Sequence, residues 1–153
     1  MSNIVLKSAR GVNYSKLQQL LAAKNWRNAD IETDEVMLIA AGRKGWLDEY
    51  SIDNFPCEDL RTINQLWLHY SQGQFGFSIQ KQIYESLGGT REYNIQVWEK
   101  FCDHVGWING ENWYNQLIFD VELAPPGHLP CCVVRGVDLY DVFGERILWR
   151  KDL

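Results

Sequence analysis

Residues 66–80 read LWLHYSQGQFGFSIQ and decide the fold, because one helix ends and another begins within them. The apolar residues that lead into this stretch recur at the spacing of one helical stripe: Leu60, Ile63, Trp67 and Tyr70. Proline suits the first turn of a helix, so we expect this helix to run from Pro56 to about Tyr70. The polar run 71–74 interrupts the pattern, and a second helix is expected over 78–87. The stretch therefore predicts two helices joined by a tight connection.

Two phenylalanines flank Gly76 immediately before the second helix. One interpretation is that Phe75 and Phe77 fill the core at the turn between the helices, and we expect at least one of them to do so. The other interpretation is that the Phe77 ring lines a groove for a ligand. The sequence leaves both roles open for Phe77.

Helical periodicity continues along most of the chain. Further helices are expected over 15–23, over 29–41, after Asn94 and over 137–143. A capping box of Ser15 and Gln18 is expected to open the first of these, and Gly42 to end the second. Residues 43–54 are expected to form a loop or short turns, and only residues 118–121 have a strand-like pattern. The predicted fold class is all-α, as a single domain over residues 1–153.

Composition excludes several classes of function. The chain has 153 residues, of which 46% are hydrophobic, enough for one sizeable core. Its net charge of −5 argues against general nucleic-acid binding, which needs a clustered basic surface. No apolar run reaches the length of about 18 residues that spans a bilayer, and the start has no signal-peptide pattern. We expect a cytoplasmic protein, or one of the plastid stroma if a leader has been removed, with peripheral membrane association left open.

Seven tryptophans in 153 residues are unusual. Several are expected in the core, but the number also suggests a surface built for flat, apolar contacts. The stretch from Trp107 to Pro130 is long for a connection in a compact domain, and it is too aromatic to be disordered. This long irregular aromatic loop near the C-terminal third is therefore predicted to be a binding loop.

The sequence carries no recognisable catalytic arrangement. His69, His104 and His128 lie far apart in different contexts, and no metalloprotease, nucleophile-elbow or phosphate-loop motif occurs. The four cysteines contain no CxxC pair, so structural roles are favoured over a metal site. The sequence therefore predicts that the protein is not an enzyme and holds no metal of its own.

Three prolines in six residues make the segment PPGHLP, residues 125–130, stiff and extended. This segment, with His128 and Leu129, is either a spacer across the surface or one rigid wall of a cleft, and the sequence leaves the two open. Arg135 follows after the small apolar run 131–134. Its guanidinium is suited to the carboxylate of a ligand, although an ordinary surface salt bridge is the alternative.

The chain resembles the Genomes-Uncoupled porphyrin-binding regulators of magnesium chelatase, which occur in cyanobacteria and plastids. The resemblance extends over nearly the whole chain, and its most specific block is residues 66–80. The other matching blocks follow in order: Leu20-Leu21, Trp26 to Asp30 with Glu32-Thr33, Phe55-Pro56 with Asp59-Leu60, Ile63 to Trp67, Val105 to Trp107, and Ala124 to Pro130. The resemblance covers the core domain, without the N-terminal helical bundle of some relatives.

The resemblance implies a compact, all-α, cupped-hand fold that binds protoporphyrin IX or Mg-protoporphyrin IX non-covalently. It implies a partner, the large porphyrin-binding subunit of magnesium chelatase, and no catalysis by the chain itself. The loop with Trp107, Trp113 and Tyr114 is similar to the family's flexible finger, and Arg135 to its pocket arginine. The candidate porphyrin-binding residues are Arg135, Trp107, Trp113, Tyr114, Phe77, His128, Leu129 and Cys132.

The chain also departs from the family pattern. The position three residues after Arg135, where relatives have a second arginine, is Asp138, and the aromatic loop is shorter. An aspartate facing the pocket would repel a propionate. The alternative is a divergent sensor or protein-interaction module of the same fold that binds a bilin or no pigment. Covalent bilin attachment through Cys131 or Cys132 is a variant of this alternative.

Overall fold

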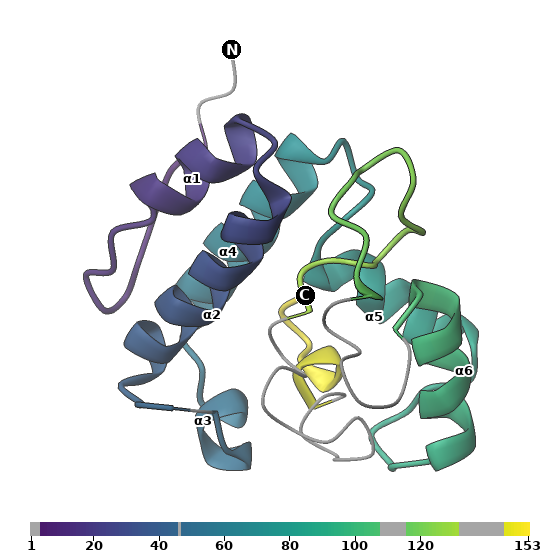
Figure 1. Ribbon diagram of the computed structural model, residues 1–153. Helices are drawn as coiled ribbons and strands as arrows, with labels where there is room; N and C mark the ends of the chain where they lie inside the picture. The colour runs from purple at the N-terminus through teal and green to yellow at the C-terminus, as the bar shows by residue number, and fades with distance from the viewer. Residues whose placement is uncertain (1–3, 46, 108–115, 132–145) are drawn as a thin grey trace.

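The computed structural model describes residues 4–45, 47–107, 116–131 and 146–153 (Figure 1). Its helices are α1 (Ser15–Ala22), α2 (Trp26–Ala41), α3 (Glu49–Asp53), α4 (Cys57–Tyr70), α5 (Phe77–Ser86), α6 (Ile95–Val105) and the 3-10 helix η3 (Ile147–Trp149). No strand occurs within these described ranges. The predicted all-α fold class is confirmed over them, whereas the strand-like pattern of residues 118–121 was misleading. The helix predicted over 137–143 lies outside the described residues.

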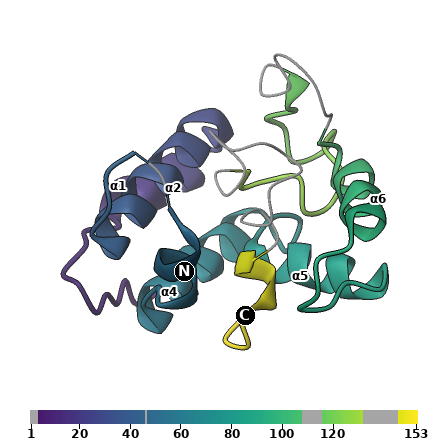
Figure 2. The same ribbon diagram turned by 90° about the horizontal axis from the view of Figure 1, so that it is seen from below.

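The helices fall into two groups. Helix α1 packs on α2 and α4, while α5 packs on α6 and η3. Figures 1 and 2 show the α1, α2 and α4 group on one side and the α5 and α6 group on the other. Residues 116–131 lie between the two groups, and the chain ends shortly after η3. The connection between α4 and α5 joins the two groups. Residues 66–80, which contain the end of α4 and the start of α5, therefore decide how the fold is divided.

Helix ends follow local capping in some places and not in others. Gly42 ends α2 in the left-handed conformation with φ 68°, as predicted. Helix α2 begins at Trp26, three residues earlier than expected, because the Asn25 side chain accepts a hydrogen bond from the Asn28 N–H at 3.4 Å. The capping box of Ser15 is not formed. The residue before α1 is Tyr14, whose side chain makes no capping hydrogen bond.

Helix α3 lies where only a loop or short turns were predicted. Asp48 opens it by accepting hydrogen bonds from the backbone N–H and the hydroxyl of Ser51, at 2.8 and 2.5 Å. These bonds, and the charge of Arg43, hold the pKa of the Asp48 carboxyl below its usual value. A helix of five residues is too short to be stable alone. Its stability therefore depends on the rest of the fold.

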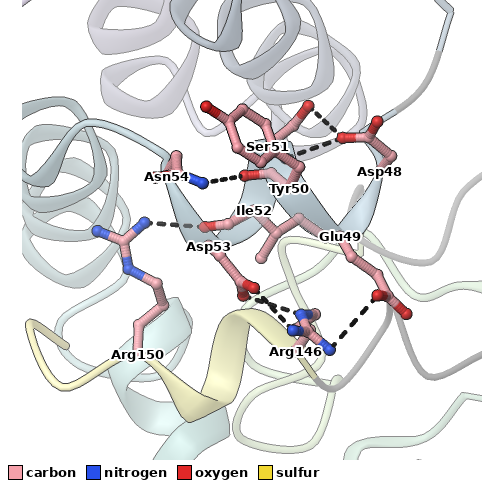
Figure 3. Close-up of polar contacts among 9 residues, drawn as sticks. All are labelled: Asp48, Glu49, Tyr50, Ser51, Ile52, Asp53, Asn54, Arg146 and Arg150. Atoms are coloured by element: carbon pink, nitrogen blue, oxygen red, sulfur yellow. Dashed lines mark hydrogen bonds and ion pairs between the residues drawn. The ribbon is translucent and has the colours of Figure 1, made fainter.

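Two C-terminal arginines supply that support (Figure 3). The Arg146 guanidinium forms a two-pronged pair with the Asp53 carboxylate, at 2.8 and 2.7 Å. Arg150 donates to the carbonyl oxygens of Ile52 and Phe55 at 2.9 and 2.7 Å, and so pairs backbone groups at the end of α3. These contacts span more than 90 positions in the sequence, which is why local periodicity did not reveal α3.

The core contains two aromatic clusters. In the first, Trp26 stacks on Trp67 with ring centroids 6.1 Å apart, and Phe75 meets both edge-on. The Trp67 indole N–H donates to the Thr33 hydroxyl at 2.9 Å, so its polar group is paired where it is buried. The second cluster surrounds Phe101 between α5 and α6, and its rings belong to Tyr84, Trp98, Phe101 and Trp107.

The tryptophans therefore serve the interior more than the sequence suggested. Trp26, Trp67, Trp98 and Trp107 are each at most 4% exposed. Trp46 and Trp113 lie outside what the structure describes.

Within the described helices, none combines the length and the apolar character that crossing a bilayer would require.

Candidate functional site

The two most distinctive motifs of the sequence dock on each other. The Gln74 side-chain amide donates to the Ala124 carbonyl at 2.8 Å, and the Gln74 backbone carbonyl accepts the Gly127 N–H at 2.8 Å. Gly76 donates its N–H to the Leu129 carbonyl at 3.0 Å. The start of α5 is thus joined by backbone and amide hydrogen bonds to the proline-rich segment 124–131, although about 50 residues separate them in the sequence.

Gln80, one turn into α5, completes this joint. Its side-chain N–H groups donate to the Gly127 and Pro130 carbonyls at 3.0 and 2.8 Å, and the residue is fully buried. Gly127 has φ 78°, and a Cβ there would lie 3.0 Å from Ile83 and 3.2 Å from Val105. Position 127 therefore requires glycine both for its backbone conformation and for its close packing.

Asp30 ties the end of the same segment to α2. It is fully buried, and its carboxylate accepts the Cys131 backbone N–H at 2.8 Å and the Cys131 thiol at 3.0 Å. Segment 124–131 is thus bonded to α2, to α5 and, through His128, to the end of α6. We call this segment, 124–131, the hub. The residues that leave it, 132–145, include Arg135 and lie outside the described residues.

His128 is the most highly connected residue of the hub. Its ring is fully buried, with Nδ1 2.6 Å from the Val105 carbonyl oxygen and Nε2 2.8 Å from the Ile118 backbone nitrogen. Its backbone carbonyl accepts the Trp107 indole N–H at 2.8 Å. Burial lowers the pKa of His128, although the Val105 carbonyl and the charge of Asp30 oppose that shift. The ring is therefore neutral at physiological pH.

The structure places the eight candidate residues in two sets. Phe77, Trp107, His128 and Leu129 are all in the interior, at most 2% exposed. All four are therefore core residues, and filling the core is one of the two roles that the sequence left open for Phe77. Trp113, Tyr114, Cys132 and Arg135 lie outside the described residues. Direct contact between any of the eight and a pigment stays a prediction.

The sequence did not identify Gln74, Gln80 and Asp30 as residues that organise the site. All three fall inside blocks that carry the family resemblance, which was the available signal. Their roles depend on contacts over 47 to 101 positions, and no local pattern encodes those. A buried Asp or Gln is rare without a partner, but burial itself has to be known first.

One cavity of about 670 Å³ lies between the N-terminal segment and the outer side of α4. Its lining includes Ile4, Lys7, Arg61, Leu68 and His69, and none of the eight candidate residues. Within the described part of the chain, no three His, Cys, Asp or Glu side chains are grouped so as to hold a metal ion.

Comparison with known proteins agrees first on the class of fold. The solved structure of GUN4 from Chlamydomonas reinhardtii matches with a TM-score of 0.76, over 96% of this chain and 97% of that one, at 28% sequence identity. The profile of the GUN4-like family matches residues 7–147. Because that match covers most of the sequence, the chain belongs to the GUN4-like family.

Curated relatives come from cyanobacteria and from plastid-bearing eukaryotes. The Ycf53-like protein of Synechocystis sp. is 34% identical over 154 residues, which are 95% of this chain and 63% of the relative. The "Tetrapyrrole-binding protein, chloroplastic" of Arabidopsis thaliana is 28% identical over 135 residues, 82% of this chain and 51% of that protein. This chain spans between about half and two thirds of the length of these relatives.

Proposed function

We propose that this protein binds protoporphyrin IX or Mg-protoporphyrin IX non-covalently and regulates magnesium chelatase, without catalysing a reaction itself. The observation that carries the proposal is the family match over residues 7–147. It is supported by the Arabidopsis relative, whose name records tetrapyrrole binding. The proposed role belongs to chlorophyll synthesis in cyanobacteria and chloroplasts.

The chemistry of a porphyrin suits a helical frame with aromatic loops. Burying on the order of 300 Å² of apolar pigment surface at about 25 cal/mol per Å² contributes roughly 7 kcal/mol before ordering costs. In the proposed complex Trp113 and Tyr114 cover the macrocycle, and Arg135 pairs with a propionate. Phe77 and Leu129, both fully buried, support the wall behind the pigment.

The hub is the structural support for this arrangement. It holds the chain at Ile118, a few residues after Tyr114, and at Cys131, a few residues before Arg135. Both proposed pigment-contacting segments therefore start or end on one set of buried hydrogen bonds. A rigid base of this kind reduces the ordering cost of binding.

The proposed partner is the large porphyrin-binding subunit of magnesium chelatase, and the proposed location is the cyanobacterial cytoplasm or the plastid stroma. Peripheral association with a membrane is compatible with this role. The partner is tested by adding the purified protein to chelatase subunits and measuring the rate of magnesium insertion. An unchanged rate with pigment-loaded protein would exclude the regulatory role and leave pigment binding standing.

Pigment binding is tested by titrating the folded protein with protoporphyrin IX and following intrinsic tryptophan emission. We expect saturable quenching at micromolar pigment. The control titration uses a tetrapyrrole-free aromatic dye at the same absorbance, which corrects for light absorbed by the pigment itself. A folded protein that shows only the absorbance correction would refute the proposal.

A second candidate function is a sensor module that binds a bilin or no pigment. The observation that favours it is Asp138, an acidic residue at the position where the family resemblance predicts arginine. An open-chain bilin is flexible and depends less on two fixed cations. Parallel absorbance titrations with a bilin and with protoporphyrin IX separate the two candidates, and mass spectrometry of the purified protein detects any covalent adduct at Cys131 or Cys132.

A further inference from the structure

One buried imidazole contacts the chain on both sides of residues 106–117, the part of the aromatic loop that carries Trp113 and Tyr114. Val105 is the last residue of α6 before this part, and Ile118 is the first residue after it. The His128 ring contacts the backbone of both, at 2.6 Å to the Val105 oxygen and 2.8 Å to the Ile118 nitrogen. The His128 carbonyl also accepts the Trp107 indole N–H. Three points around the base of the loop thus meet at one residue.

The hydrogen bonds themselves fix the state of the ring. A backbone N–H can only donate, so Nε2 must accept from Ile118 and therefore carries no proton. A carbonyl oxygen can only accept, so Nδ1 must carry the proton that points to Val105. Only the neutral ring protonated at Nδ1 satisfies both contacts. A proton added at Nε2 would place two donors face to face and break the bond to Ile118.

The backbone at the end of α6 lies close to the ring. Position 106 is a glycine with φ 81°, and a Cβ there would lie 3.0 Å from Nδ1 of His128. Gly106 thus lets the end of α6 approach the ring closely. Among the described residues, Asp30 on α2 is the ionisable group whose charge acts on the ring. Val105 and Gly106 of α6, and Ile118 across the loop, are uncharged.

We propose that His128 is a positioning residue for pigment binding, whose neutral ring holds the two ends of the loop that carries Trp113 and Tyr114. The inference rests on the proposed function, because it names the residue on which the geometry of that loop depends. It reassigns His128 from a pigment contact to a support. Affinity for the pigment then follows the hydrogen-bonding state of a ring that does not touch it.

Two substitutions separate hydrogen bonding from mere bulk. His128→Gln keeps one donor and one acceptor on a single carbon, as the two ring nitrogens flank Cε1, and it cannot be protonated near neutral pH. His128→Leu fills part of the volume and keeps neither group. We expect His128→Leu to raise the dissociation constant for protoporphyrin IX about tenfold or more, and His128→Gln to raise it less than about threefold. His69→Gln, at an exposed position on α4, is the control for histidine loss.

The pH profile gives the readout that a purely structural role would not move. The ratio of wild-type to His128→Gln affinity is measured from pH 8 to pH 5, so that titration of the pigment cancels. Because burial lowers the pKa of His128, we expect the ratio to stay constant near neutral pH and to fall only at acidic pH, below the ordinary histidine pKa of about 6.5. Equal affinities of His128→Leu and wild type, or a flat ratio, would overturn the proposal. If His128→Leu does not fold, the ratio alone decides.

A pigment-free measurement distinguishes this inference from the proposed function. Exchange of the Ile118 amide hydrogen is followed by NMR in wild type and in His128→Gln over the same pH range. We expect protection at neutral pH in both proteins and its loss at acidic pH in wild type alone. If no pigment binds but this exchange pattern is seen, the positioning role of His128 stands and the porphyrin function fails. If pigment binds and the Ile118 amide exchanges alike in both proteins at every pH, the positioning role of His128 is refuted.

Discussion

Replacing Gln80 by leucine tests whether the hub is a source of stability. Leucine is of similar volume, and it removes both hydrogen bonds that Gln80 donates, to the Gly127 and Pro130 carbonyls. Each carbonyl left buried without a partner costs about 1 to 3 kcal/mol. The substitution also removes the Gln80 Oε1, a buried acceptor with no partner among the described residues. That removal offsets about one such penalty, so we expect a net loss of about 2 kcal/mol.

The measurements are urea unfolding and thermal unfolding at neutral pH, both followed by far-UV circular dichroism. In a chain of 153 residues, a loss of 2 kcal/mol lowers the melting temperature by roughly 4 to 8 °C. The matched control is Gln82→Leu, the same change two positions along α5 at an exposed site, and it should alter the free energy of unfolding by less than about 0.5 kcal/mol. If both variants unfold alike, the buried amide does not stabilise the joint, and the argument for the hub is wrong.

Three further predictions address affinity, packing and pH. Arg135→Ala should weaken protoporphyrin binding about tenfold in the quenching titration, since a charged hydrogen bond contributes about 1.5 kcal/mol or more. The control, Arg10→Ala, should bind as wild type does. If Arg135→Ala also binds as wild type does, Arg135 is not in the pocket. Tyr14→Phe removes the 2.6 Å hydrogen bond from the Tyr14 hydroxyl to the buried Asp59 carboxylate and should cost about 1.5 kcal/mol in urea unfolding; a change under 0.5 kcal/mol contradicts this. Because burial lowers the pKa of His128, the unfolded chain binds a proton at mildly acidic pH that the folded chain does not. The free energy of unfolding should therefore decrease as the pH falls below about 6.5, by up to 1.4 kcal/mol per pH unit. An equal dependence of the free energy of unfolding on pH in wild type and His128→Gln would contradict this.

The sequence predicted those parts of the fold that local chemistry specifies. The helices around residues 66–80, the glycine stop at Gly42 and the cap at Asn94 all follow from periodicity and capping. Helix α3 was missed because its stability depends on Arg146 and Arg150, more than 90 positions away. Residues 118–121 have a strand-like pattern but no partner strand within the described ranges, so they form no sheet.

The site was predictable in part for a different reason. The sequence singled out the motifs at 74–80 and 124–131, but it could not show that they bind each other. Phe77 and Trp107 were candidates for contact with a ligand, whereas the structure buries both. Tryptophan is suited both to cores and to flat ligands, and a single sequence does not distinguish the two.

The hub explains why stability and pigment affinity should separate at some positions and not at others. Segment 124–131 is held through backbone carbonyls and amides, so a change at Gln80 or His128 loosens the base of both proposed pigment-contacting segments at once. Such changes should lower stability and affinity together. Arg135 lies beyond the last hub contact at Cys131, and its substitution should lower affinity alone. If substitution of Arg135 lowers stability and affinity together, as at Gln80, then Arg135 is a structural residue. It would then not be the cation that pairs with the pigment.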